Sequence, residues 1–259
     1  MNLDLTSKRA IVTGGSKGIG FACAKTLLKE GVRLVVSSRS AHNLKKAKSK
    51  LDKLGEIHVL QADLSKSDEA CEMVKSAKDI LGGIDILVNS AGAAKQSPLS
   101  QLSSSAWSDA MKAKYFTYIH TIHAVLPIMR KTYCDGAIVN IIGTGGKFPL
   151  PFHLAGGAAN AALMLTTSGM AGVLGVDKIR INGVNPGYIR TDRLKHIIEA
   201  KKQDSGVKNV EEKIVNQIPL SRMGEADDVA NLVAFLVSSR ASYITGANIS
   251  IDGGLSLAI

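Results

Sequence analysis

The stretch that decides the fold of this chain is Thr13-Gly14-Gly15-Ser16-Lys17-Gly18-Ile19-Gly20. It lies between an apolar, β-branched run that ends at Thr13 and a segment with helical periodicity over 18–30. Glycines at a strand-to-helix turn let the backbone come close to a pyrophosphate, and the free N–H groups of the helix N-terminus face the anion. The placement of these glycines between strand and helix predicts a dinucleotide site.

The rest of the chain alternates in the same way. Apolar runs lie at 9–13, 33–37, 57–60, 85–89, 136–142, 179–184 and 248–251, and helical patterns lie near 18–30, 42–54, 67–81, 107–130, 156–175 and 226–238. This repetition predicts an α/β protein with a single-domain Rossmann fold, a doubly wound, seven-stranded, mainly parallel sheet with helices on both faces. We expect residues 1–259 to form one domain, because α/β folds often reach this length as one unit.

Two segments depart from the alternation. Residues from about 190 to 219 are polar and charged, which is typical of a substrate lid over a site. The helical pattern over 156–175 is apolar nearly all round, so it must pack against more than one neighbour. We expect another copy of the chain to supply the second neighbour.

Composition narrows the function classes. The net charge is +10, but only 4% of residues are aromatic and no nucleic-acid motif is visible, so we expect no nucleic acid partner. The densest basic stretch, over 45–53, has the spacing of a solvated helix face. No apolar run is long enough for a membrane span, and the N-terminus has no secretory pattern, so we expect a soluble, cytoplasmic protein with no membrane partner. The three cysteines form no metal-binding cluster, and we expect reduced, mostly packed thiols and no metal.

The second apolar run indicates which dinucleotide binds. An acidic residue about 20 positions beyond the glycines usually holds the ribose 2′-hydroxyl, whereas a basic residue accommodates a 2′-phosphate. Here the run ends in Ser37-Ser38-Arg39-Ser40, and no acid occurs between Gly31 and Leu51. Arg39 and Lys17 therefore predict NADP(H) in preference to NAD(H); the alternative is that both are ordinary surface cations.

Over nearly its whole length the sequence resembles the short-chain dehydrogenase/reductase superfamily. The matching motifs are TGGSKGIG, Asp63-Leu64, Asn89-Ser90-Ala91-Gly92, Asn185-Pro186-Gly187, Arg222-Met223-Gly224, Tyr243-Ile244-Thr245-Gly246 and Asp252-Gly253-Gly254. The resemblance implies a cofactor site made of Gly14, Ser16, Lys17, Gly18, Ile19, Gly20, Arg39, Asp63, Leu64, Asn89, Ala91, Gly92, Asn160, Pro186, Gly187, Ile189 and Thr191. It also implies that the helices around 107–130 and 156–175 pair in a homodimer or homotetramer.

The sequence departs from the family where the chemistry occurs. The family uses an Asn, a Ser, and a Tyr and Lys spaced as YxxxK. Aligning Ile138–Gly143 with the family's IVNISS places Gly143 at the Ser position, and Gly156 stands thirteen residues later at the Tyr position. Reading back from the Ala-Ala-Leu at 161–163 places Asn160 at the Lys position, and the pattern that begins at Trp107 places Lys114 at the Asn position. The Asn and Lys positions have thus exchanged residue types.

The nearest residues with suitable chemistry are Thr144, Lys147, His153 and Tyr188. His153 titrates near neutral pH and is a candidate acid or base, unless it is merely solvated. Thr144 either orients a substrate oxygen or caps the next turn, and Tyr188 either packs at the cofactor or transfers a proton. We expect Lys114 to be the retained functional cation, unless it simply pairs with a carboxylate.

The favoured function is an NADP(H)-dependent oxidoreductase acting on a small carbonyl or alcohol with Lys114, Asn160, Thr144 and His153 as candidate catalytic residues. One alternative is a cofactor-binding protein without catalysis. Another is a lyase or isomerase on the same scaffold, since function belongs to the site and not to the fold.

Overall fold

The computed structural model describes residues 2–131, 135–195, 198–199 and 209–256. Its centre is a seven-stranded sheet in the order β3-β2-β1-β4-β5-β6-β9, in which every neighbouring pair is parallel. The strands are β1 (Arg9–Thr13), β2 (Arg33–Ser38), β3 (Ile57–Gln61), β4 (Ile86–Asn89), β5 (Gly136–Ile141), β6 (Ile179–Pro186) and β9 (Asn248–Ile251). The predicted doubly wound Rossmann sheet is confirmed, and all seven expected runs are its strands.

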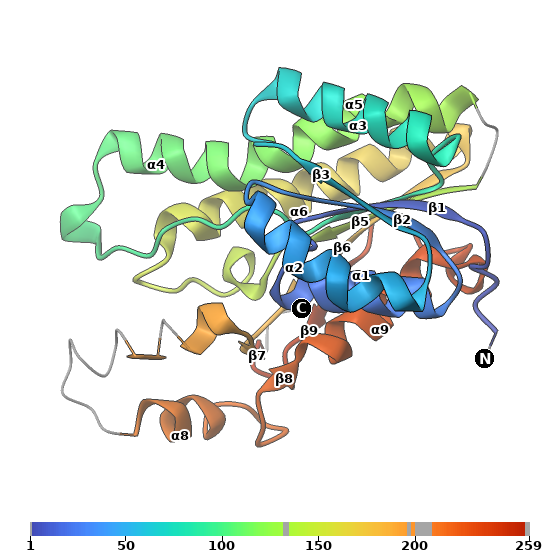
Figure 1. Cartoon of the computed structure of the whole chain (residues 1–259). Helices are drawn as coiled ribbons and strands as arrows, with labels where there is room; N and C mark the ends of the chain where they lie inside the picture. Colours follow the sequence, from blue (N-terminus) through green and yellow to red (C-terminus); the bar gives the residue numbers. More distant parts are fainter. Residues whose placement is uncertain (1, 132–134, 196–197, 200–208, 257–259) are drawn as a thin grey trace.

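Helices cover both faces of this sheet (Figure 1). One face carries α1 (Gly18–Lys29), α2 (Ala41–Leu51) and α9 (Ala226–Val237), and the other carries α3 (Ser67–Leu81), α5 (Thr117–Lys131) and α6 (Leu154–Leu174). Successive strand residues point to opposite faces. Thus Val12 packs in the core on the α1 side, whereas Ile11 packs in the core on the α3 side.

A buried chain of side-chain amides and hydroxyls joins the central strands near their carboxyl ends. The Asn89 amide donates to Asn140 at 3.0 Å, and the Asn140 amide donates to Thr167 on α6 at 3.0 Å. The Thr121 hydroxyl of α5 donates to the Asn89 carbonyl oxygen at 2.8 Å. The network therefore fixes β4, β5, α5 and α6 relative to one another, at the edge where ligands of open α/β sheets bind.

The expected helix over 107–130 is in fact three segments. It begins earlier, as α4 (Ser104–Ala110), because the Ser103 hydroxyl accepts a hydrogen bond from the Ala106 N–H at 3.2 Å and caps it. A π-helical turn (Met111–Phe116) then leads into α5. The Thr117 hydroxyl donates to the Lys112 and Ala113 carbonyls at 3.1 and 3.2 Å, which satisfies backbone groups beside this wider turn.

Other boundaries differ by small amounts. The segment expected at 42–54 is α2 followed by a short 3₁₀ turn, Asp52–Leu54, and α6 begins two residues before the expected start. Lys45, Lys46 and Lys50 are exposed on α2 while Leu44, Ala47 and Leu51 are buried, which confirms the solvated basic face.

The segment expected as a lid carries an apolar cluster of its own. It adds a two-stranded sheet of β7 (Ile189–Arg190) and β8 (Gly224–Glu225), and a short helix, α8 (Val210–Val215). Its buried apolar side chains are Leu194, Ile198, Val210, Ile214, Ile218 and Met223. Residues 196–197 and 200–208, which belong to the expected lid, lie outside the described residues.

α6 is buried on one side only. Ala159, Leu163 and Ala171 are buried, whereas Leu165 and Val173 are 78% and 65% exposed. By length and composition, the segment Leu154–Asp177 also passes a test for a membrane span, which is weak evidence because core helices pass it too. Within a single chain, the outer side of α6 therefore has no packing partner among the described residues, although the sequence predicts neighbours on more than one side.

Candidate functional site

The glycine-rich turn after β1 packs against main-chain atoms, which leave no room for a side chain at Gly14 or Gly20. Gly14 has φ +66, and a Cβ there would lie 2.8 Å from the Cα of Ala91. A Cβ on Gly20 would lie 2.5 Å from the Gly14 carbonyl oxygen. The Thr13 hydroxyl accepts hydrogen bonds from the Ser90 and Ala91 N–H groups, at 3.1 and 3.2 Å, and holds the loop after β4 against the turn. Only glycine fits this cradle.

The N-terminus of α1 opens from the same turn. Its N-cap residue, Lys17, makes no side-chain cap, and the first turn of α1 carries no acidic residue. Its first N–H groups are thus available to an anion, with the favourable end of the helix dipole behind them. A Cβ on Gly18 would lie 3.5 Å from the Thr191 methyl group, so Thr191 lies over this turn.

Of the residues expected at the 2′-phosphate, Arg39 directly follows β2 and Lys17 is the N-cap of α1. Arg39 and Lys17 are exposed, and neither forms an ion pair with another part of the chain that the structure describes. The Arg39 carbonyl oxygen accepts a hydrogen bond from the Gln61 amide at 3.0 Å. The Asp63 carboxylate accepts hydrogen bonds from the Ser65 hydroxyl and N–H, and these bonds hold the pKa of Asp63 below its usual value.

A cavity of about 690 Å³ lies at the carboxyl ends of β4, β5 and β6. Its walls include four expected catalytic residues, Lys114, Thr144, His153 and Asn160. They also include six expected cofactor residues, Ile19, Gly92, Pro186, Gly187, Ile189 and Thr191. Of the remaining expected cofactor residues, Leu64 and Asn89 are buried, and Gly14, Ser16, Lys17, Gly18, Gly20, Arg39, Asp63 and Ala91 do not line this cavity.

Lys114 is a buried cation at the floor of the cavity. Its Nζ donates to the Tyr118 hydroxyl at 2.8 Å and to the Ile141 carbonyl at 2.9 Å, and it lies 4.5 Å from the Tyr118 ring centroid. The Tyr118 hydroxyl itself donates to the Ile141 carbonyl at 2.6 Å. No carboxylate pairs with Lys114 within the described chain. Burial, and then the charge of Arg193, lower the pKa of Lys114 to about 7.

The His153 imidazole occupies the space above Gly156. A Cβ on Gly156 would overlap the Cε1 and Nε2 atoms of this ring, and a Cβ on Gly145 would lie 3.4 Å from its Cδ2. The Nδ1 atom of His153 is buried and has no hydrogen-bond partner among the residues described. Burial, Arg193 and Lys114, in that order, lower the pKa of His153, so the ring is neutral at neutral pH.

Asn160, Gly143 and Thr144 line the cavity, and Gly143 lies beside Asn160. Gly143 has φ +120, which an L side chain rarely adopts, and a Cβ there would lie 3.3 Å from the Asn160 amide nitrogen. Thr144 is 8% exposed and begins a 3₁₀ turn that no side chain caps. The structure therefore does not bear out the alternative that the Thr144 side chain caps this turn.

Two residues at the site escaped the sequence reasoning. Arg193 lines the cavity, and its only hydrogen bond within the described residues is a long one, 3.4 Å, to the Ala94 carbonyl. Tyr118 supports Lys114, and the spacing of the two along one helical face is the signal that sequence could have offered. Of the other candidates, Tyr188 lines the cavity, whereas the Lys147 ammonium donates to the Asn248 carbonyl at 3.2 Å.

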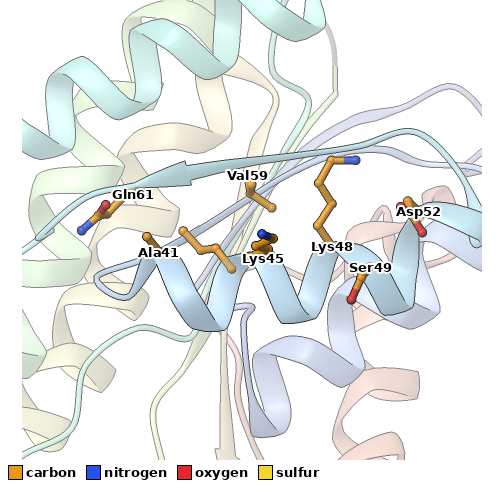
Figure 2. A pocket seen from close by; sticks show the side chains of 8 residues that line it. Ala41, Lys45, Lys48, Ser49, Asp52, Val59 and Gln61 are labelled. Carbon is orange, nitrogen blue, oxygen red and sulfur yellow. The ribbon is translucent and has the colours of Figure 1, made fainter.

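A second hollow, about 420 Å³, lies elsewhere, between α2 and β3 (Figure 2). It is bordered by Lys45 and Lys48 of α2, by Asp52 of the 3₁₀ turn after α2, and by Val59 and Gln61 of β3. None of the expected catalytic or cofactor residues lines this hollow, so the large cavity is the better candidate site.

The described residues contain no group of three His, Cys, Asp or Glu able to hold a metal. Of the three cysteines, Cys23 is buried, and burial raises its pKa to about 12. Cys71 is exposed, contrary to the expectation of mostly packed thiols, and Cys134 lies outside the described residues.

Comparisons with known proteins cover nearly the whole chain. A family model described as enoyl-(acyl carrier protein) reductase matches residues 14–256. The 3-oxoacyl-[acyl-carrier-protein] reductase FabG of Staphylococcus epidermidis is 32% identical over 253 residues, covering 96% of this chain and 99% of that protein.

Two solved structures are similar throughout. YwfH, an NADPH-dependent reductase involved in bacilysin biosynthesis, has a TM-score of 0.92 at 31% identity and covers 97% of this chain and 100% of its own. An NADPH-bound short-chain oxidoreductase from Pseudomonas aeruginosa PAO1, described as containing an atypical catalytic center, has a TM-score of 0.89 at 28% identity and covers 98% and 99%.

Proposed function

Because the chain belongs to the short-chain dehydrogenase/reductase superfamily, we propose that it is an NADP(H)-dependent oxidoreductase that acts on a carbonyl or alcohol through a non-standard active site. The observation that carries the proposal is the His153 ring in the space above Gly156, inside a cavity that also contains the buried Lys114. The part of the cavity where the reaction would occur, here called the reaction half, therefore has polar side chains other than those of the family's tetrad.

The cofactor part of the proposal rests on the cradle. The Gly14 and Gly18 turn, the uncapped N-terminus of α1 and Thr191 would hold the pyrophosphate, and Pro186, Gly187 and Ile189 would border the nicotinamide end. Lys17 and Arg39 would pair with the 2′-phosphate, which favours NADP(H) over NAD(H). When bound, the cofactor supplies or accepts the hydride.

The catalytic part of the proposal is that the family's tetrad is replaced. Gly143 stands for the Ser, Gly156 for the Tyr, Asn160 for the Lys and Lys114 for the Asn. The two glycines supply no hydroxyl, and a positioned acid typically contributes roughly 10²- to 10⁴-fold in rate. Reduction of an ordinary carbonyl should therefore be slow unless another group provides the proton.

Lys114 is the group best suited to hold that proton. An ammonium has three donors, and two of them are used by Tyr118 and Ile141, which leaves one toward the cavity that Lys114 lines. Its pKa of about 7 lies near working pH, where general acids and bases are most efficient. The Tyr118 hydroxyl and the Ile141 carbonyl hold the Nζ in place.

His153, Thr144 and Asn160 would orient the substrate. Because its pKa is lowered, His153 is a neutral hydrogen-bonding group at neutral pH and a poorer store of protons than Lys114. The Thr144 hydroxyl and the Asn160 amide make no hydrogen bond to described residues and line the same cavity. They are free to bond a substrate oxygen or the ribose.

The test is NADPH consumption by the purified protein over a panel of ketones and aldehydes. Lys114→Met should remove most of the turnover, and His153→Ala should weaken it by a smaller factor. Lys112→Met is the matched control, because Lys112 lies on the same π-helical turn but is exposed. NADPH binding without turnover of any substrate would favour the non-catalytic alternative, and substrate conversion without net cofactor change would favour a lyase or isomerase.

We also propose a cytoplasmic homodimer or homotetramer in which the outer side of α6 is covered. Leu165, Val173 and Val176 are exposed along this side and at its end, and α6 has no charged residue to keep that side in water. Light scattering on the purified protein decides the matter. A strictly monomeric species at micromolar concentration contradicts this assembly.

A further inference from the structure

The cavity collects positive charge without any negative partner. Lys114, His153 and Arg193 line it, and its described lining includes no aspartate or glutamate. The charge of Arg193 acts on both Lys114 and His153, and the charge of Lys114 acts on His153, so the three groups lie within range of one another. Of the three, Lys114 is buried and has no carboxylate partner among the described residues, although buried charges in proteins are normally paired. Arg193 is exposed, and His153 is neutral at neutral pH.

Arg193 also has unused hydrogen-bonding capacity. Among the described residues it makes a single, long hydrogen bond, to the Ala94 carbonyl at 3.4 Å. A guanidinium has five N–H donors in a fork that matches a carboxylate. A ligand oxyanion would therefore satisfy donors that the chain itself leaves free.

Part of the remaining wall is apolar. Phe148 and Phe152 are 43% and 57% exposed, and Leu150, Tyr188 and Leu255 line the cavity beside them. Large exposed apolar side chains around a concave site indicate ligand contact. The cavity thus offers cations for one end of a ligand and an apolar surface for the other.

We propose that the substrate of this site is an organic anion, a carbonyl or alcohol compound whose carboxylate is held by Arg193, within range of the Lys114 charge, while its apolar body contacts Phe148 and Phe152. The inference rests on the proposed function for the hydride step and adds the class of substrate. Anion binding would also favour the protonated form of Lys114, because a nearby negative group raises the pKa of an ammonium. Binding of the anion should therefore take up a proton at pH 8.

The experiment is calorimetric titration of the protein saturated with NADPH, using benzoylformate and levulinate, each compared with its methyl ester. Esterification removes the charge and keeps most of the shape. We expect each acid to bind roughly 10- to 150-fold more tightly than its ester, the range of a charge-assisted hydrogen bond. Titration in two buffers of different ionisation enthalpy should show proton uptake with the acids, and none in Lys114→Met.

Arg193→Met should abolish the preference for the acids. Lys195→Met is its matched control, because Lys195 is an exposed cation two residues along the same segment and does not line the cavity. Equal affinity for acid and ester, or a preference unchanged by Arg193→Met, overturns the proposal. The proposal is also overturned if the acids bind only in the absence of NADPH, since Arg193 and Lys114 would then bind the cofactor instead of the substrate.

Failure of the proposed function gives a separate result. If NADPH does not bind at all, the oxidoreductase assignment fails, and the comparison of acid with ester is made on the protein without cofactor. A preference for the acid there still supports an anion site, and its absence refutes the anion site independently.

Discussion

The cofactor cradle, made by the glycine turn between β1 and α1 and by the loop after β4, differs from the reaction half of the cavity, made by β5, the π-helical turn and α6, in what faces two glycines of each. Gly14 and Gly20 face backbone atoms, 2.8 and 2.5 Å from where a Cβ would be. Gly156 and Gly143 instead face the ends of side chains, His153 and Asn160. Main-chain atoms cannot move aside without a shift of the surrounding fold, whereas a side chain can be replaced by substitution. Backbone packing therefore fixes the cofactor cradle at Gly14 and Gly20, whereas the reaction half can be rebuilt at Gly156 and Gly143.

The largest expected effect comes from Gly14→Ala. The new Cβ would meet the backbone of Ala91 at a residue with φ +66, so overpacking and left-handed strain add, at about 1–3 and 1–2 kcal/mol. We expect NADPH affinity to fall by roughly 100-fold or more, measured by calorimetry. Gly82→Ala is the matched control, because Gly82 has φ +76 but nothing within 4 Å of its Cβ position. It should lose stability and keep NADPH affinity; equal losses of affinity would contradict the cradle.

Next in size is the preference between the two cofactors. Arg39→Leu should weaken NADPH by roughly 10- to 150-fold and leave NADH nearly unchanged, because only the 2′-phosphate contact is removed. Lys17→Met should act in the same direction. Lys46→Met, an exposed lysine on α2, serves as the control. The NADP(H) assignment is wrong if the unaltered protein binds both cofactors equally in calorimetric titrations.

The same contrast explains what sequence could predict. The glycine turn and the doubly wound parallel sheet follow from local spacing and from the alternation of strands and helices. The positions of Pro186–Gly187, Lys114 and Asn160 follow from the resemblance to the family's motifs, and Thr144 and His153 follow from their closeness along the chain to Gly143 and Gly156. Arg193 could not be found this way, because its segment has no periodicity tying it to the sheet, and the contact of His153 with Gly156 depends on the turn before α6.

The third prediction concerns that contact. Gly156→Ala should cost about 1–3 kcal/mol of unfolding free energy, because the methyl group overlaps the His153 ring. In a His153→Ala background the same change should stabilise by up to about 1 kcal/mol, since alanine is the better helix former. Additive free energies in the double-mutant cycle would rule out the overlap.

The smallest effect is a pH dependence of stability that belongs to Lys114. Its pKa is about 7 in the folded protein, against 10.5 as the ordinary value, so between these pH values the unfolded chain binds more protons than the folded one. Stability from this group therefore rises with pH across that window, by at most about 1.4 kcal/mol per pH unit. Chemical denaturation at pH 7.5 and 8.5 should show the slope in the unaltered protein and in Lys112→Met, and Lys114→Met should flatten it. The Tyr118 hydroxyl keeps its bond to the Ile141 carbonyl in that variant, so the floor of the cavity should persist. An unchanged slope in Lys114→Met would mean that Lys114 stays charged in the folded protein. The proposal that Lys114 donates the proton in the reaction would then be wrong.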